Sequence, residues 1–327
     1  MSDASSDPFA PWLRSLGPVP WSRATSTSAF QGVAALGAIQ RNALLDTIFY
    51  DVNNLTDEEV ASLRPWLAKE GAILVVPPSG GSSLEVYASL ADFESVGTRR
   101  RLGALAVAGV GSSALGAAAF ARNVADAYGG PVAAVVSGYG LADLLTEALG
   151  GFFWFGQLNG LRHLFELVED PLAFLEPYNQ SRGTLASPLL HLSRDTRTVY
   201  RLLMAPGANF DLVVGHSKGN LVLSEALYGL ARLHPERAAD LARAMTIVTV
   251  SAVIAMPSLF PRIIDVIGEL DDFGRFNSRR DIDPDVVVPE AWHHTNTALP
   301  GALAVTPVLE KVLASRAAAP PALVKVA

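Results

Sequence analysis

The segment Gly215-His216-Ser217-Lys218-Gly219 constrains this chain more than any other. An apolar run, Phe210 to Val214, precedes the segment, and a helix-like stretch, Asn220 to Leu233, follows it. The pattern G-x-S-x-G between a strand and a helix predicts a tight turn with the serine at its apex. Glycine on both sides removes the Cβ atoms that would clash where the backbone doubles back. The sequence therefore predicts that Ser217 stands clear of a sheet as a nucleophile and that the amide of Lys218 opens the next helix.

The composition excludes several kinds of protein. Of the 327 residues, 50% are hydrophobic and 17% are charged, so a globular chain is expected rather than a disordered one. The net charge of −7 argues against a nucleic-acid-binding surface. The absence of cysteine excludes disulfides, thiolate metal sites and cysteine nucleophiles. The first residues lack the basic start and apolar core of a secretory signal, and a cytoplasmic location is expected.

One segment is long enough to cross a bilayer. Leu102 to Ala121 carries no charged residue between Arg101 and Arg122. Four glycines and two serines interrupt this run. The run divides more naturally into a strand at 102–108, a Gly/Ser loop at 109–113 and an Ala-rich helix. We therefore expect no integral membrane span.

Three regions are expected along the chain. Residues 1–100 form an N-terminal extension with helices and edge strands, a core follows at 101–315, and residues 316–327 form a disordered tail. In the core, predicted strands alternate with helices, which favours a mostly parallel sheet covered on both faces. A capping box is expected at Thr56–Glu59. The expected strands are 72–76, 102–108, 131–136, 210–214, 246–254, 263–267 and 285–288, and the main helices are 114–128 and 220–233.

Residues 141–206 break this alternation. A stretch of about sixty-five residues is too long for a simple connection, so we expect an insertion with helices of its own. The run Phe152-Phe153-Trp154-Phe155 gives this insertion an aromatic cluster. Each of these residues taken singly is consistent with core packing. As a unit, an aromatic insertion before the strand at 210–214 favours a helical lid or an acyl-binding wall.

A serine nucleophile requires a base, and on this architecture the base follows the serine and an acid along the chain. Three histidines lie downstream of the serine: His234, His293 and His294. His234 ends the helix after the turn and is explained as a helix cap. The other two follow the strand at 285–288, at the carboxyl end of the sheet, where ligands bind in open α/β sheets. His294 is preferred because a small hydroxyl residue, Thr295, follows it, and His293 is the alternative.

The acid and the oxyanion donors are expected on neighbouring loops. Asp271 comes just after the strand at 263–267, from where its carboxylate can reach the base, and Asp272 is the alternative. The backbone amide of Lys218 is expected as one oxyanion donor because it follows the nucleophile. The second expected donor is the amide of Val110, in the Gly-rich loop after the strand at 102–108.

These segments together resemble the α/β-hydrolase family. Residues 103–140 resemble its opening strand, oxyanion loop, helix and GYG strand; VVGHSKGN resembles its nucleophile elbow, GELD its acid turn and AWHHT its histidine loop. The likeness covers about residues 100 to 310. It implies an α/β-hydrolase fold and a lipase- or esterase-like serine hydrolase that cleaves a carboxylic ester through Ser217, Asp271 and a histidine. The sequence departs from the family at Ala108-Gly109, where His-Gly is usual, and the insertion does not indicate a subfamily, so the resemblance does not imply a particular substrate.

Two other functions are consistent with parts of the sequence. Gly109-x-Gly111-x-x-Ala114 matches a loose dinucleotide-binding fingerprint, which would indicate an oxidoreductase. The acidic residue that this fingerprint requires is missing, because Val136-Ser137-Gly138 occupies its place. A non-catalytic binding protein on the same scaffold is the second alternative. We expect no cofactor and no metal, since His163 and His191 lack carboxylates at ligand spacing, and the expected partner is a small apolar acyl ester.

Overall fold

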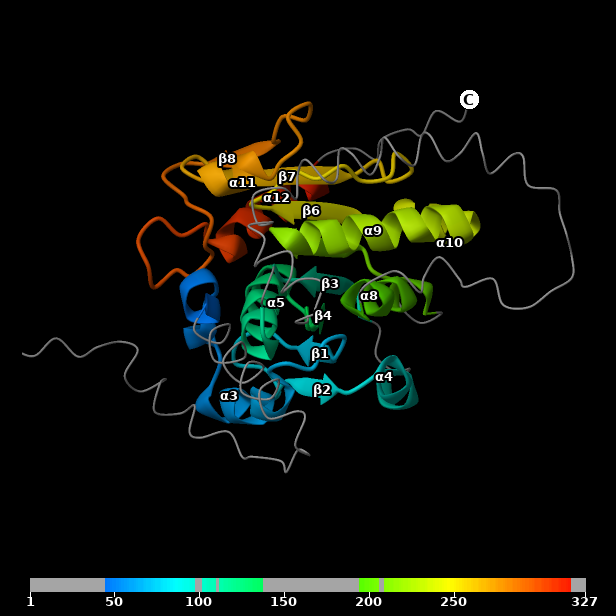
Figure 1. Cartoon of the computed structure of the whole chain (residues 1–327), viewed down its shortest axis with the longest axis vertical. Coiled ribbons are helices and arrows are strands. Elements are labelled where there is room, and N and C mark those ends of the chain that lie inside the picture. Colours follow the sequence, from blue (N-terminus) through cyan, green and yellow to red (C-terminus); the bar gives the residue numbers. More distant parts are fainter. Residues whose placement is uncertain (1–44, 98–101, 110–111, 138–193, 206–208, 319–327) are drawn as a thin grey trace, which may run out of the picture.

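The computed structural model of the chain describes residues 45–97, 102–109, 112–137, 194–205 and 209–318. Within these residues, helices cover both faces of one eight-stranded sheet (Figure 1). The strands are β1 (Ile73–Val76), β2 (Glu85–Tyr87), β3 (Ala104–Val107), β4 (Val132–Val135), β5 (Leu212–His216), β6 (Thr246–Val250), β7 (Ile263–Gly268) and β8 (Val286–Val288). The expected strands from residue 72 onward therefore all form, with small shifts at their ends.

The sheet has the order β2-β1-β4-β3-β5-β6-β7-β8. β1 pairs antiparallel with both β2 and β4, and every other neighbouring pair is parallel. The α/β class and the mostly parallel sheet are thus confirmed. Because the central strands run the same way, the loops after β3, β5, β7 and β8 all leave the sheet at one edge.

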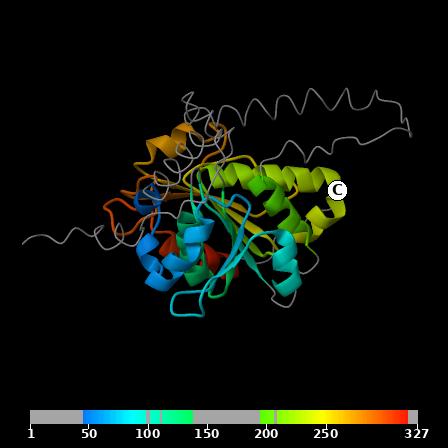
Figure 2. The ribbon, with the colours of Figure 1, turned by 60° about the horizontal axis from the view of Figure 1, so that its bottom comes forward.

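Helices pack on the two faces as separate layers (Figure 2). α5 and α12 contact each other on one face, and α9 contacts α8 and α10 on the other. The helices are α3 (Asp57–Leu63), α4 (Leu90–Gly97), α5 (Ala114–Tyr128), α8 (Arg194–Met204), α9 (Lys218–Leu233), α10 (Pro235–Ala242), α11 (Asp272–Phe276) and α12 (Val305–Ala318), with 3-10 turns η1 (Val52–Asn54) and η2 (Arg64–Trp66).

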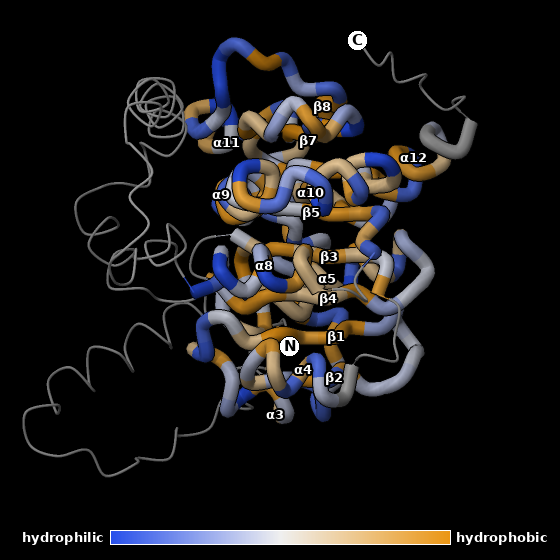
Figure 3. The backbone as a smooth tube through the Cα atoms, turned by 90° about the vertical axis from the view of Figure 1, so that its right-hand side faces the viewer, coloured by the Kyte–Doolittle hydropathy of each residue, from blue (hydrophilic) through white to orange (hydrophobic). Residues whose placement is uncertain are grey.

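The sheet separates two apolar cores. Leu212 and Val214 of β5 point into the core beneath α5 and α12, whereas Val213 points into the core beneath α8 and α9. Successive side chains of a strand alternate between faces, so a strand covered on both sides must be apolar throughout. Figure 3 shows the strands as an apolar layer through the middle of the molecule.

The run from Leu102 to Ala121 divides as its glycines and serines predict. β3 occupies its first part, and α5 begins at Ala114, where the Ser113 side chain accepts a hydrogen bond from the Leu115 amide. Gly129 ends the helix in the left-handed conformation, with φ of 75°. No helix among the described residues combines the length and the apolar character needed to cross a membrane.

The N-terminal region is joined closely to the rest of the sheet. β2 is the edge strand of the sheet, and β1, the strand expected at 72–76, lies between β2 and β4 and pairs with both. The capping box of α3 is confirmed: the Thr56 hydroxyl accepts from the Glu59 amide at 3.2 Å, and the Glu59 carboxylate accepts from the Thr56 amide at 3.0 Å. The same Glu59 carboxylate pairs with Arg122 of α5, and both side chains are buried.

Much of the expected insertion lies outside the described residues. This holds for 141–193, which contain the aromatic cluster at 152–155, His163 and His191. The end of the expected insertion is α8, which packs against α9 and buries Val199, Leu202 and Leu203 in the core. This part of the expected insertion is therefore a helix that covers one face of the sheet. Of the expected tail, residues 319–327 also lie outside the described residues.

Candidate active site

Ser217 occupies the sharp turn between β5 and α9. Its φ of 52° and ψ of −122° are rare for a residue with a side chain, and such strain is typical of functional sites. The Ser217 amide donates to the Val250 carbonyl at 2.8 Å, which fixes the turn against β6. The side chain is only partly buried. The strand–serine–helix turn predicted from G-x-S-x-G is confirmed, and we call Gly215–Gly219 the elbow.

The two glycines of the elbow are required by close packing. A Cβ on Gly215 would collide with the side chain of Asn220, one turn into α9. A Cβ on Gly219 would collide with the backbone carbonyls of Val107 and Ala108, at the end of β3. Neither glycine has a positive φ, so the constraint is lack of space rather than backbone conformation. The elbow is thereby pressed against the start of the loop expected to hold the oxyanion.

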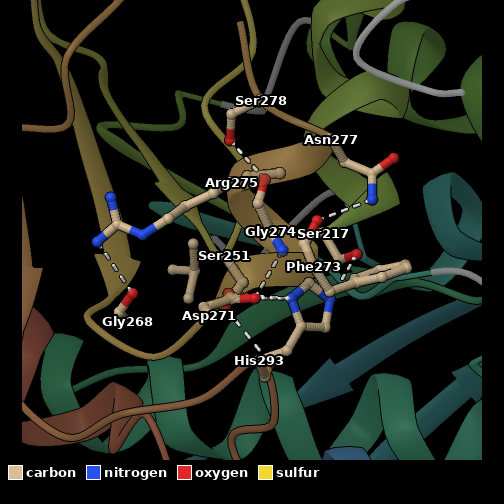
Figure 4. A network of polar contacts seen from close by, with 12 residues as sticks. Ser217, Ser251, Gly268, Asp271, Phe273, Gly274, Arg275, Asn277, Ser278 and His293 are labelled. Carbon is tan, nitrogen blue, oxygen red and sulfur yellow. Dashed lines mark hydrogen bonds and ion pairs between the residues drawn. The ribbon is translucent and has the colours of Figure 1, made fainter. Parts of the chain in front are cut away.

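Three side chains from separate loops form a hydrogen-bonded series (Figure 4). The Nε2 atom of His293 lies 3.0 Å from Ser217 Oγ, and its Nδ1 atom lies 2.9 and 3.0 Å from the two carboxylate oxygens of Asp271. With Nδ1–H donating to the carboxylate, Nε2 is free to accept from the serine hydroxyl. The loops after β5, β7 and β8 thus bring a hydroxyl, an imidazole and a carboxylate together at one edge of the sheet.

The carboxylate of Asp271 is held from two sides. It is fully buried, and its Oδ1 accepts from the Gly274 amide at 2.6 Å, which caps the short helix α11. Asp272, the alternative acid, is the first residue of α11 and is exposed. The structure therefore brings the preferred acid to the histidine. Asp265, which lies inside β7, is hydrogen-bonded to Thr249 instead.

The structure places His293, and not the preferred His294, beside Ser217. His294 Nε2 lies 3.1 Å from the Pro300 carbonyl, and its buried Nδ1 has no partner among the described residues. The hydroxyl of Thr295, on which the preference rested, donates to the Phe49 carbonyl at 2.8 Å and so has a structural role. His293 is the one of the two histidines whose ring faces the elbow.

Aromatic rings pack around the His293 imidazole. Phe273 of α11 meets it edge-on with ring centres 4.7 Å apart, and Phe49 meets it edge-on at 6.1 Å. Edge-to-face contacts of this kind are favourable and restrict how the ring can turn. Neither phenylalanine was identified from the sequence, because nothing in the local pattern relates residue 49 to residue 293.

Two further polar side chains join the elbow to the neighbouring loops. His216 is buried; its Nδ1 lies 3.0 Å from the Tyr50 hydroxyl, and its Nε2 lies 3.0 Å from the His293 carbonyl. The amide of Gly109 donates to the same Tyr50 hydroxyl at 2.7 Å. Burial, helped by the neighbouring His293, lowers the pKa of His216 to about 3, and burial raises the pKa of Tyr50. Both side chains are therefore neutral near pH 7.

Neither residue is predicted as part of the site from the sequence. His216 was treated only as the variable position of the G-x-S-x-G pattern, although a histidine there carries two hydrogen-bonding nitrogens into a buried turn. Tyr50 carries no motif and belongs to the N-terminal region. A polar side chain at the variable position of the elbow was the one available signal.

Of the two expected oxyanion donors, Lys218 lies within the described residues and Val110 does not. Lys218 is the first residue of α9, so its amide lies at a helix N-terminus, as predicted. Gly109, directly before Val110, is packed against Ser217: a Cβ on Gly109 would lie 3.2 Å from Ser217 Cβ. The start of the expected oxyanion loop is therefore next to the serine.

Among the described residues, no group of three or more His, Cys, Asp or Glu side chains is placed to hold a metal ion. No protein-family model, curated protein or solved structure matches the chain. The function must therefore be argued from the geometry of the site.

Proposed function

We propose that the protein is a serine hydrolase with an α/β-hydrolase fold, and that it cleaves a carboxylic ester through an acyl-enzyme. The observation that carries this proposal is the series from Ser217 Oγ through His293 to Asp271. A hydroxyl, an imidazole and a buried carboxylate linked in this order are the groups that activate a serine. The chain order of serine, acid and histidine and the strained serine turn support the α/β-hydrolase type in particular.

In the acylation step, Ser217 Oγ attacks the ester carbonyl carbon while His293 Nε2 takes the hydroxyl proton. Asp271 accepts the Nδ1–H hydrogen bond throughout and stabilises the imidazolium that forms. The tetrahedral intermediate collapses when the C–O bond to the alcohol breaks, and the imidazolium gives its proton to the leaving oxygen. The products of this step are the acyl-serine and the free alcohol.

In the deacylation step, water repeats the attack. His293 Nε2 takes a proton from the water as its oxygen adds to the acyl carbon. The intermediate collapses, the Ser217 oxygen leaves, and it recovers its proton from the imidazolium. The carboxylic acid is released and the enzyme returns to its starting state without a cofactor.

Backbone amides stabilise the negative charge on the intermediate. The proposed donors are the amides of Lys218 and Val110, the second of which lies outside the described residues. An oxyanion-hole donor typically contributes about 3–4 kcal/mol to transition-state stabilisation. The contact between Gly109 and Ser217 supports a loop position close enough to supply the second amide.

The proposed substrate is an apolar acyl ester. This part of the proposal rests on the sequence of residues 152–155, an aromatic cluster that lies outside the described residues. Apolar walls favour long acyl chains because each buried methylene contributes about 0.8 kcal/mol.

The dinucleotide-binding alternative is disfavoured by what occupies the start of α5. A dinucleotide places its pyrophosphate at the N-terminus of this helix. Here the carboxylate of Asp46 accepts from the Ser113 amide at 3.0 Å, and the Gly109 amide is bonded to Tyr50. A buried acidic side chain at that position competes with a phosphate group.

Hydrolysis of p-nitrophenyl esters of increasing chain length tests the proposal. The wild-type protein should release p-nitrophenol, faster from longer acyl chains than from acetate, and Ser217→Ala should lose this activity with its melting temperature almost unchanged. Activity of Ser217→Ala within a few-fold of wild type would contradict the serine mechanism. A folded wild-type protein that hydrolyses none of these esters would favour the non-catalytic binding protein.

A further inference from the structure

A single chain of hydrogen bonds crosses the candidate site from one loop to another. The amide of Gly109 is bonded to the Tyr50 hydroxyl at 2.7 Å, that hydroxyl to His216 Nδ1 at 3.0 Å, and His216 Nε2 to the His293 carbonyl at 3.0 Å. Tyr50 and His216 are 3% and 1% exposed, so water does not compete for these groups. The rings of the two residues also pack edge to face, with centres 5.3 Å apart.

The direction of every bond in this chain is fixed by its two ends. The Gly109 amide can only donate, and the His293 carbonyl can only accept. The Tyr50 oxygen therefore accepts from Gly109 and donates its own proton to His216 Nδ1. His216 in turn carries its proton on Nε2 and donates it to the carbonyl. Each polar group is satisfied in one arrangement only, and such fully connected buried networks are rigid.

The two ends of this hydrogen-bond series lie in the loop after β3, which is expected to supply an oxyanion donor, and in the loop after β8, which carries the proposed base. Gly109 begins the loop expected to supply an oxyanion donor and lies against the nucleophile. The carbonyl at the other end belongs to His293, whose ring is the proposed base. His216 itself is the residue directly before Ser217. One tyrosine hydroxyl thus connects the oxyanion loop to the backbone of the base loop through the elbow.

The residues beside Tyr50 hold the same loop. The Phe49 carbonyl accepts from the Thr295 amide at 2.8 Å, and the carboxylate of Asp51 accepts from the Thr297 hydroxyl at 2.7 Å. Asp51 also accepts from Asn123 of α5 at 2.7 Å. The backbone around Tyr50 is therefore anchored independently of its hydroxyl, which makes the hydroxyl a group that can be removed by itself.

We propose that Tyr50 is a positioning residue of this site: through His216, its hydroxyl holds the oxyanion loop and the base loop in register with Ser217. This inference rests on the proposed function. Tyr50 does not touch the reacting atoms and acts through Gly109 and His216. Its loss should therefore slow the acylation of Ser217 without weakening substrate binding.

The test is the substitution Tyr50→Phe with Tyr128→Phe as its matched control. Each change removes one hydroxyl that is hydrogen-bonded: the Tyr50 hydroxyl to Gly109 and His216, and the Tyr128 hydroxyl to Asp211 at 2.9 Å. Asp211 precedes β5, at the opposite edge of the sheet from Ser217. Both variants should lose some thermal stability, so stability alone does not distinguish a positioning role from a structural one.

The decisive measurement is the rate at which a fluorophosphonate labels Ser217, normalised to the folded fraction, together with kcat and KM on an ester. Tyr50→Phe should lower the labelling rate and kcat roughly ten- to a hundredfold with KM within about threefold, and Tyr128→Phe should change the rate less than about twofold. Equal labelling rates for the two variants would overturn the inference while leaving the proposed function intact. A wild-type protein that is not labelled at Ser217 would instead overturn the proposed function.

A second pair of variants tests the other member of the chain. In His216→Gln the amide oxygen can accept from Tyr50 and the amide nitrogen can donate to the His293 carbonyl, whereas His216→Leu can do neither. The labelling rate of His216→Gln should exceed that of His216→Leu by roughly tenfold or more. The double variant Tyr50→Phe, His216→Leu should be no slower than His216→Leu alone, because both changes break the same chain. Multiplying effects would show that the two residues act separately and would contradict the inference.

Discussion

His293 Nε2 lies 3.0 Å from Ser217 Oγ, although 76 residues separate them along the chain. The distance is that of a hydrogen bond to a hydroxyl. Two further contacts hold the ring: the buried Asp271 carboxylate at Nδ1, and the Phe273 ring, which packs nearly perpendicular to it. A solvent-exposed histidine meeting a serine by chance would lack this support.

The two adjacent histidines should respond very differently to substitution. His293→Ala removes the proposed base and should lower kcat by roughly three decades or more. His294→Ala removes only a contact with the Pro300 carbonyl and should leave kcat within a few-fold of wild type. Steady-state hydrolysis by both purified variants provides the comparison. Equal, mild losses would indicate that neither histidine is the base.

The two adjacent aspartates provide a matched pair for the acid. Asp271→Asn removes the negative charge that would stabilise an imidazolium, and it puts an NH₂ group in place of one of the two oxygens that lie 2.9 and 3.0 Å from His293 Nδ1. Turnover should fall by roughly three to four decades with KM little changed, as expected for a disturbed imidazole tautomer. Asp272→Asn alters an exposed side chain and should have little effect. A larger loss at Asp272 would move the assignment by one residue.

Two glycines of α9 should respond oppositely to alanine. Gly219→Ala places a Cβ against the carbonyls of Val107 and Ala108, and should lower the free energy of unfolding by roughly 1–3 kcal/mol. Gly229→Ala, later in the same helix, brings its Cβ to an ordinary 3.7 Å from the Tyr200 ring. It should raise that free energy by roughly 0.5–1 kcal/mol, because alanine favours the helix. Urea unfolding of both variants measures the difference, and effects of the same sign would contradict the packing argument.

Local sequence patterns were sufficient to predict the elbow and the position of Asp271. An apolar strand, a glycine-flanked serine and a helix define the elbow within about twenty residues, and their geometry follows from steric rules. The position of Asp271 just beyond a strand likewise predicted the carboxylate that meets His293. The structure adds the reason that Asp271 is fixed while Asp272 is not: its carboxylate caps α11.

The choice between His293 and His294 needed contacts that no local pattern contains. The loop after β8, which carries both histidines, is held by a hydrogen bond from the Thr295 hydroxyl to the Phe49 carbonyl, and these two residues are 246 positions apart. Tyr50 is 166 residues from His216. Such pairings depend on how the N-terminal region packs against the carboxyl edge of the sheet, which a single sequence does not encode in any short window.

Acid should weaken the fold through His216. Its pKa is lowered from the ordinary 6.5 to about 3 in the folded protein, so below pH 6.5 the unfolded chain takes up a proton that the folded chain does not. The stability owed to the neutral histidine is complete above pH 6.5 and is lost as the pH falls toward 3, by up to about 1.4 kcal/mol per pH unit. His216→Gln lacks this group. Wild type should therefore lose unfolding free energy relative to His216→Gln between pH 6 and pH 4, and parallel pH dependences of the two proteins in urea titrations would contradict the low pKa of His216.

Fluorophosphonate labelling with mass spectrometry tests the central claim most directly, because it needs no knowledge of the substrate. The wild-type protein should gain a single adduct, and peptide mapping should place it on Ser217. Ser217→Ala should gain none, and His293→Ala should react slower by roughly two decades or more. A folded wild-type protein that gains no adduct, or gains it on a residue other than Ser217, would contradict the account.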